Sequence, residues 1–325
     1  MAAKHKNRIC RSIALGLLVF ALQVFQAVAQ DKKLNILSIK STKELKEFFR
    51  YSDDRVPLVC AHRGGATIDY PENAIATFEN TLGQMHAFFE IDPRLTKDGV
   101  IVVFHDETLD RTTNGTGKLA DHTWDEIKQL KLKDAKGNIT PYGIHKLEEI
   151  LQWAKGKTIL VLDKKDVPYS SLLKLIEANN AEAHVLVSVY RLKEAQYYHK
   201  RNPNIMFEAI IKDIATMKMY DEAGIPWGNI VAFTGQPLNT PLNEMLHKKR
   251  VMCMASTVKF QDKGKTKNNR AIGYREVVTN GGIDILLTNR PTDLVTALQL
   301  LIQQKSSKYK FFGQTTYSPV QAVVK

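Results

Sequence analysis

The most informative part of the sequence spans residues 61–119. It begins AHRGGATIDYPENAIATFENTL at residues 61–82 and continues FFEIDPRLTKDGVIVVFHDETLDRTTNGTG at residues 88–117. Chemically active side chains lie near the ends of its apolar runs at four positions, His62, Glu90, Asp92 and His105. Carboxylates bind hard cations, and imidazoles exchange protons near neutral pH. The stretch therefore predicts an arrangement of strands and also a chemistry at their ends.

The same alternation of an apolar, β-branched run with an amphipathic helical segment recurs along the rest of the chain. Continuous apolar runs are typical of strands that are buried on both faces. Their alternation with helices predicts parallel strands joined by right-handed crossovers. The expected strands are residues 57–62, 87–92, 158–163, 184–190, 205–211, 229–234, 251–257 and 283–288.

A ninth apolar run, residues 100–105, follows the second strand too closely for a crossover helix. Because the turn sequence KDG at residues 97–99 precedes it, we expect an antiparallel return strand that brings His105 beside the carboxylates of the second strand. Eight parallel strands remain, and eight close a (β/α)8 TIM barrel, an α/β fold. Residues 93–145 are then a small insertion after the second strand.

We expect one folded domain, because no low-complexity linker interrupts the repeat. The barrel domain is predicted to span residues 56–305, after a lead-in at residues 30–55 and before a C-terminal tail at residues 306–325. The aromatic part of this tail, residues 309–317, is expected to pack on the barrel exterior. An open doubly wound sheet is the competing architecture, and it is disfavoured because no glycine-rich phosphate loop follows the first strand.

The first 29 residues differ from the rest of the chain. They combine a basic start, an apolar run from Ile13 to Phe25 and the small-residue sequence Ala27-Val28-Ala29. This pattern predicts a secretory signal peptide at residues 1–29, cleaved after Ala29. A membrane anchor is disfavoured, since the apolar run is shorter than the ~20 residues that span a bilayer. We therefore expect a secreted or periplasmic protein without stable membrane insertion.

The composition is that of a soluble globular protein, with 44% hydrophobic and 25% charged residues among 325. The net charge of +12 would fall to +8 when the four basic residues of the signal peptide are lost, and it favours anionic ligands. No dense basic tract accompanies this charge, so no nucleic-acid partner is expected. Cys60 and Cys253 lie in apolar runs and are expected to be buried free thiols, because their spacing indicates no disulfide.

Three carboxylates are expected to meet in the mouth of the barrel, because the active site of a TIM barrel lies at the carboxyl ends of its strands. Glu90 and Asp92 are two residues apart and point to the same side of their strand. Carboxylates held side by side repel unless a cation or a proton joins them. Asp163 adds a third oxygen donor, and an oxygen-only set favours Ca²⁺ or Mg²⁺ over zinc. The alternative is a set of salt bridges with Lys165 as the partner.

His62 and His105 suit a general acid and a general base. Arg63 offers a two-pronged donor for a phosphate, and Lys165 offers a point charge. The alternatives are structural histidines and cations that balance the neighbouring carboxylates. The lysine-rich segment at residues 259–270 follows the seventh strand and would overhang the same face. There it could attract an anionic head group or remain a solvated loop.

Several short motifs, taken together, resemble the glycerophosphodiester phosphodiesterase family. They are HRG at 62–64, PEN at 71–73, E-x-D at 90–92, T-x-DG at 96–99, HD at 105–106 and L-x-RTT-x-G-x-G at 109–117, followed by LDKK at 162–165 and TNRP at 288–291. The resemblance covers residues 57–301 and is most specific over 61–119. It implies a TIM barrel with a small insertion after the second strand, in agreement with the strand count.

The resemblance also implies an activity: metal-dependent hydrolysis of a small-molecule phosphodiester, a glycerophosphodiester, to sn-glycerol 3-phosphate and an alcohol. Carried over by position, the resemblance makes His62 and His105 the acid/base pair. It makes Glu90, Asp92 and Asp163 the ligands of one divalent cation, Ca²⁺ or Mg²⁺. It makes Arg63 and Lys165 the phosphate-binding residues. The oligomeric state is not implied.

The sequence differs from the usual family pattern at three places. Asp163 stands where the family usually has glutamate, so its carboxylate reaches one methylene less. Asn289 stands where the family usually has aspartate, which removes a charge near the last strand. Ser256 stands where the family often has tryptophan, so an aromatic wall of the pocket would be lost.

Two other functions are compatible with parts of the pattern. A phospholipase-type phosphodiesterase acting on intact lipids would need an apolar rim beside the site, and the sequence shows no clear one. A non-catalytic protein that binds phosphorylated ligands would be expected to lack a histidine or a metal ligand. Both histidines and all three carboxylates are present, which favours the enzyme.

Overall fold

The computed structural model describes residues 32–317. The predicted signal peptide, residues 1–29, lies outside the described residues, as does the last part of the predicted tail. Residues Leu34–Thr315 form one compact unit, which contains the barrel and the predicted site. Between residues 32 and 317, no helix is long and apolar enough to cross a membrane.

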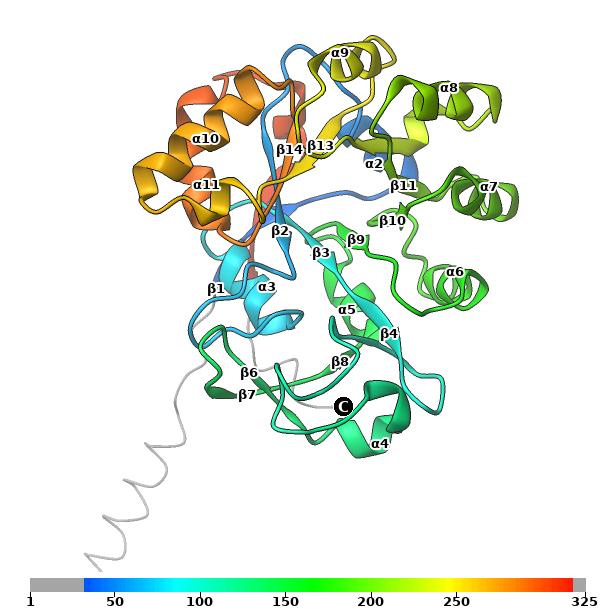
Figure 1. Ribbon diagram of the computed structural model, residues 1–325, viewed down its shortest axis with the longest axis vertical. Coiled ribbons are helices and arrows are strands. Elements are labelled where there is room, and N and C mark those ends of the chain that lie inside the picture. The colour runs from blue at the N-terminus through cyan, green and yellow to red at the C-terminus, as the bar shows by residue number, and fades with distance from the viewer. Residues whose placement is uncertain (1–31, 318–325) are drawn as a thin grey trace, which may run out of the picture. The chain divides into compact units, whose positions relative to one another are not determined.

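Eight parallel strands close into a barrel in which β14 pairs with β2 (Figure 1). Each expected run contains one of them, so the predicted TIM barrel is confirmed. Their bounds are β2 (Leu58–His62), β3 (Phe88–Ile91), β9 (Leu160–Leu162), β10 (Val185–Val189), β11 (Met206–Ile210), β12 (Ile230–Phe233), β13 (Cys253–Ser256) and β14 (Ile285–Thr288). Cys60 and Cys253 are buried and unpaired, as expected.

Helices follow the strands and form the outer ring of the barrel (Figure 1). Their apolar sides supply buried residues such as Phe78, Leu172 and Leu246. In chain order they are α3 (Ile75–Leu82), α5 (Leu147–Ala154), α6 (Tyr169–Ala178), α7 (Leu192–Arg201), α8 (Ile214–Glu222), α9 (Thr240–Lys248), α10 (Lys267–Thr279) and α11 (Pro291–Leu298).

The insertion after β3 begins with the predicted hairpin. β4 (Pro93–Leu95) pairs antiparallel with β5 (Ile101–Val103), and the Phe104 amide donates to the Asp92 carbonyl at 2.8 Å. β8 (His145–Lys146) completes this small sheet. The insertion also contains α4 (Trp124–Ile127) and a second hairpin, β6 (Lys131–Lys133) with β7 (Ile139–Gly143). It has a small core of its own, so it can hold His105 and its neighbours in place.

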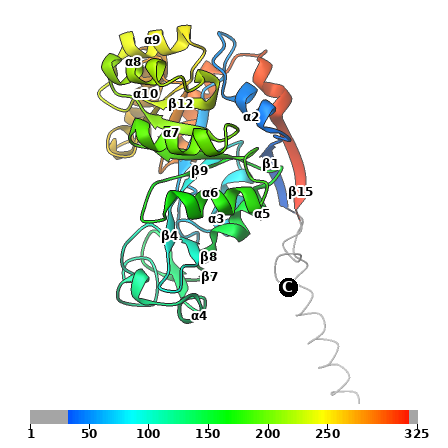
Figure 2. The same ribbon diagram turned by 90° about the vertical axis from the view of Figure 1, so that its right-hand side faces the viewer.

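The two ends of the compact unit close the amino-terminal end of the barrel. α2 (Thr42–Phe48) begins at Ser41, whose hydroxyl accepts from the Glu44 amide. Phe49 packs edge-on against Phe88 of β3, and Phe311 packs edge-on against Phe48. β1 (Lys32–Leu37) and β15 (Phe312–Tyr317) form a two-stranded sheet beside α2 (Figure 2). The aromatic tail therefore covers the end of the barrel opposite the predicted site.

Candidate active site

The predicted site residues come together at the carboxyl ends of β2, β3 and β9. His62 is the last residue of β2 and lies in register with Glu90 of β3. Asp92 follows β3, and Asp163 follows β9, where its amide donates to the Ile91 carbonyl at 2.9 Å. Three strands that are distant in the sequence thus place one group of polar side chains in the mouth of the barrel.

The centre of the site is a cluster of three carboxylates, Glu90, Asp92 and Asp163. Oxygen atoms from all three lie within 4.8 Å of one another. Glu90 and Asp92 are buried. Burial raises the pKa of Glu90 well above its ordinary range, and the charges of Asp92 and Asp163 raise it further. The cluster therefore favours a positive partner or a bound proton.

Hydrogen-bond donors surround this cluster. Lys165 bonds Asp163 and lies 3.1 Å from Oδ1 of Asp92. Burial by itself disfavours the charge of Lys165, but Asp92 and Asp163 outweigh it and raise its pKa. The Asn73 amide donates to Oδ2 of Asp92 at 2.8 Å, and the Tyr190 hydroxyl donates to Asp163 at 2.7 Å. These bonds fix the orientation of the carboxylates.

The cluster has the donor set that a hard cation needs. Oδ1 of Asp92 and Oδ1 of Asn73 are buried and have no hydrogen-bond partner among residues 32–317. Lys165 forms an ion pair with the first of these atoms at 3.1 Å. Buried oxygens without hydrogen-bond partners destabilise the folded state unless a ligand binds them. Because every donor is oxygen, the residues fit Ca²⁺ or Mg²⁺.

His62 lies between the acidic cluster and the end of the last strand. Its Nδ1 lies 2.6 Å from Oδ1 of Asn289, and its Nε2 lies 3.7 Å from Glu90. Because an amide oxygen can only accept, Nδ1 carries the hydrogen and the lone pair of Nε2 points toward the cluster. Burial lowers the pKa of His62, and the charge of Arg63 lowers it further.

His105 has a charged partner instead. Its Nδ1 lies 2.6 Å from the Asp106 carboxylate. Arg111 bonds both Asp106 and Glu72, and its hydrogen bonds, with that of His105, hold the pKa of Asp106 far below its usual range. Arg63 also bonds Glu72, at 3.1 Å. A continuous chain of hydrogen bonds and ion pairs thus connects His105 with Arg63 and the acidic cluster.

The HRGG sequence makes a tight left-handed turn that places Arg63. Arg63, Gly64 and Gly65 have φ angles of 52°, 92° and 80°. A side chain at Gly64 would meet the Phe78 ring at 2.6 Å, so only glycine fits there. Nε of Arg63 lies 3.6 Å from Asp92. The turn therefore aims the guanidinium at the position beside the carboxylates, where an anion could bind.

Four contributions were missed by sequence reasoning. Asn73 and Tyr190 orient the acidic cluster, and Asn289 orients His62. Glu208 of β11 is buried in the barrel and accepts from the Ser188 hydroxyl. The signal for Glu208 was a charged residue inside an expected apolar strand. Asn73 belongs to the PEN motif, but nothing in the sequence alone indicates its partner.

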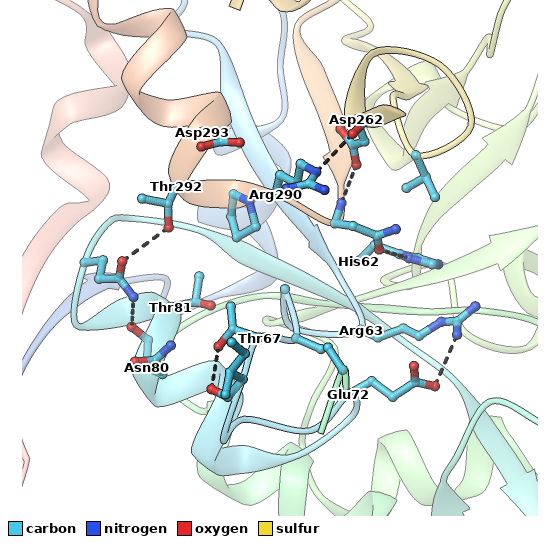
Figure 3. A pocket seen from close by; sticks show the side chains of 18 of the residues that line it. His62, Arg63, Thr67, Glu72, Asn80, Thr81, Asp262, Arg290, Thr292 and Asp293 are labelled. Atoms are coloured by element: carbon cyan, nitrogen blue, oxygen red, sulfur yellow. Dashed lines mark hydrogen bonds and ion pairs between the residues drawn. The ribbon is translucent and has the colours of Figure 1, made fainter. Parts of the chain in front are cut away.

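A pocket of about 960 Å³ opens beside His62 and Arg63, and we call it the outer pocket (Figure 3). It is formed by the loop after β2, part of α3, the tip of the β6–β7 hairpin, the loop after β13 and the start of α11. The buried Asp262 carboxylate accepts from the Asn289 amide at 2.7 Å and so joins two of these segments (Figure 3). Among residues 32–317, the lining of this pocket includes His62 and Arg63 but not the three carboxylates of the acidic cluster.

Comparison with known proteins gives one consistent family. Residues 62–291 match the profile of the Glycerophosphoryl diester phosphodiesterase family. A glycerophosphodiester phosphodiesterase from Bacillus subtilis (strain 168) is 28% identical over 241 residues, which cover 67% of this chain and 76% of the relative. The family match includes the strand ends that carry the acidic cluster.

Comparison with solved structures gives the same family. A glycerophosphoryl diester phosphodiesterase from Parabacteroides distasonis ATCC 8503 is similar with a TM-score of 0.85 and 47% identity, covering 87% of this chain and all of that one. An Oleispira antarctica phosphodiesterase, solved in complex with the product sn-glycerol-3-phosphate, has a TM-score of 0.54 and 22% identity over 75% of this chain and 97% of that one. The latter likeness concerns the fold alone.

Glu208 predicts how stability depends on pH. Burial raises its pKa from 4.5 to about 7, so the folded protein keeps a proton that the unfolded chain has lost. Wild-type stability therefore falls as pH rises from 4.5 to 7, and Glu208→Gln removes this loss. Between pH 5 and pH 8 the variant should gain about 2 kcal/mol relative to wild type in urea unfolding with chelator present. Replacing the exposed Glu148 by Gln is the control. If the free energy of unfolding of Glu208→Gln changes with pH in parallel with that of the wild-type protein, the pKa of Glu208 is not raised.

Proposed function

Since the chain belongs to the glycerophosphoryl diester phosphodiesterase family and is thus a phosphodiesterase, we propose that it hydrolyses glycerophosphodiesters to sn-glycerol 3-phosphate and an alcohol by histidine acid/base catalysis with one divalent cation. The main support for this proposal is the arrangement of side chains in the mouth of the barrel. Two histidines with different partners accompany three carboxylates, and Arg63 and Lys165 supply positive charge beside them. The similarity to the glycerophosphoryl diester phosphodiesterase from Parabacteroides distasonis, at 47% identity, supports the same reaction.

In the proposed reaction, one histidine removes the proton of the substrate's own 2-hydroxyl, whose oxygen attacks phosphorus. The other histidine protonates the departing alkoxide, so an alcohol leaves and a cyclic phosphate remains. Water then opens the cyclic phosphate while the histidines exchange roles, which restores both proton states. Attack by water in a single step would use the same pair. Asn289 and Asp106 serve this chemistry because each fixes the tautomer and direction of its histidine.

The positive side chains have a separate task. Arg63 can bond two phosphate oxygens at once, and Lys165 adds a point charge. Glu90, Asp92 and Asp163 would hold the cation, either Ca²⁺ or Mg²⁺. When bound, that cation supplies positive charge where negative charge builds up on the phosphate oxygens. Asn73 keeps Asp92 turned toward this position through its 2.8 Å hydrogen bond.

The acid/base assignment predicts the effect of removing each histidine. His62→Ala and His105→Ala should each lower the kcat for glycerophosphocholine and glycerophosphoethanolamine about 10²- to 10⁴-fold, because each removes a proton-transfer group. Release of sn-glycerol 3-phosphate should also stop with chelator and return with Ca²⁺ or Mg²⁺. Unfolding curves establish that the variants fold.

The matched control is His199→Ala on α7, which should keep wild-type turnover. Near-normal turnover in either active-site variant would make that histidine structural. If the wild-type protein binds a divalent cation but turns over no glycerophosphodiester, the proposed function is wrong.

We also propose that the protein is exported. The support is the pattern of residues 1–29, in which a basic start precedes an apolar run and the Ala27-Val28-Ala29 sequence. The exported protein should begin at Gln30, and sequencing of its amino terminus checks this. An amino terminus at Met1 on the mature protein would contradict the proposal.

A further inference from the structure

We propose that the outer pocket binds the alcohol part of the substrate and selects head groups that carry an additional anionic group, a carboxylate or a phosphate. This inference rests on the proposed function and deepens it by naming the substrate class.

The position of the outer pocket fits the part of the substrate beyond the phosphate. His62 and Arg63 line both the pocket and the catalytic site, so a substrate phosphate beside them would direct one substituent into the pocket (Figure 3). A volume of about 960 Å³ is at the upper end for small-molecule sites and far exceeds the needs of a glycerol. Larger head groups therefore have room.

The walls of the pocket carry an excess of positive charge. Five cationic and three acidic side chains line it. Two of the acids already have cationic partners: Glu72 is bonded by Arg63 and Arg111, and Asp293 by Arg270. The carboxylate of Asp262 is buried among hydroxyl groups and the Asn289 amide. None of these acids is thus directed at a ligand in the pocket.

Three of the cations remain available. Within residues 32–317, Lys136, Lys263 and Arg290 form no ion pair with a carboxylate, and all three are exposed. The charged part of each can therefore reach an anion in the pocket. Exposed cations that converge on one pocket attract a ligand anion without first losing a protein partner.

These cations come from three separate segments, and each segment is anchored. Asp134 accepts from the Lys136 and Asn138 amides and from the Asp69 amide, which fixes the hairpin tip against the loop after β2. Nε of Arg290 donates to the Asp262 carbonyl at 3.0 Å. Lys263 directly follows the same buried residue. The charges are therefore held at the pocket by the fold and are not carried on loose loops.

The pocket does not suit a quaternary ammonium group. Within the described range, residues 32–317, no aromatic side chain lines it. Recognition of choline-like groups uses aromatic faces, and here the wall is cationic instead. Choline and ethanolamine head groups thus meet like charge in the pocket, whereas a carboxylate or phosphate meets opposite charge.

Two substrates that differ by one carboxylate test this selection. Glycerophosphoserine should have a higher kcat/KM than glycerophosphoethanolamine with the wild-type protein. The ratio of the two kcat/KM values, serine substrate over ethanolamine substrate, should fall about two- to fivefold in Lys136→Gln and in Lys263→Gln, as expected when one exposed ion pair is lost. In the double variant this ratio should fall about tenfold. The preference should also weaken as sodium chloride is added, because exposed charges are screened.

The control is Lys174→Gln, which makes the same charge change on the exposed surface of α6 and should leave the ratio unchanged. Equal or inverted preference in the wild-type protein would overturn the inference while leaving the proposed function intact. So would a serine preference that neither lysine variant alters. Turnover of neither substrate would reject the proposed function and the inference together.

Discussion

Three carboxylates whose oxygens lie within 4.8 Å of one another cannot all remain charged in the mouth of a barrel without a positive partner. Much of the surrounding structure supplies partners for these carboxylates. Lys165 approaches two of the carboxylates, and Asn73 and Tyr190 donate hydrogen bonds to them. Even so, buried oxygens remain unbonded within the described chain. The arrangement is therefore better suited to binding a cation than to being neutral by itself.

The two histidines beside this cluster have different partners. His62 is bonded to the neutral amide of Asn289, and His105 is bonded to the carboxylate of Asp106. The insertion between β3 and α5 makes the second arrangement possible, because its hairpin returns His105 to the strand end and Arg111 connects Asp106 to Glu72. The amino-terminal end of the barrel is closed by aromatic packing and takes no part in this chemistry.

Much of this could be predicted from the sequence, because strand order places residues at known ends of a barrel. Glu90, Asp92 and Asp163 meet for that reason, and the turn at residues 97–99 returns His105. Contacts between loops could not be predicted. The bond between His62 and Asn289 and the approach of Lys136 to the outer pocket depend on loop conformations that no periodic pattern encodes. The pattern of residues 205–211 predicts an apolar strand and by itself gives no role to Glu208.

Direct measurement of cation binding tests whether the three carboxylates form a site for one divalent cation. Calorimetric titration of the metal-free protein with Ca²⁺ and with Mg²⁺ should show one ion bound per chain for at least one of them. Asp92→Asn should abolish this binding, and Asp125→Asn on the exposed helix α4 should retain it. Failure of the wild-type protein to bind either ion, or undiminished binding by Asp92→Asn, would show that the three carboxylates do not form this site.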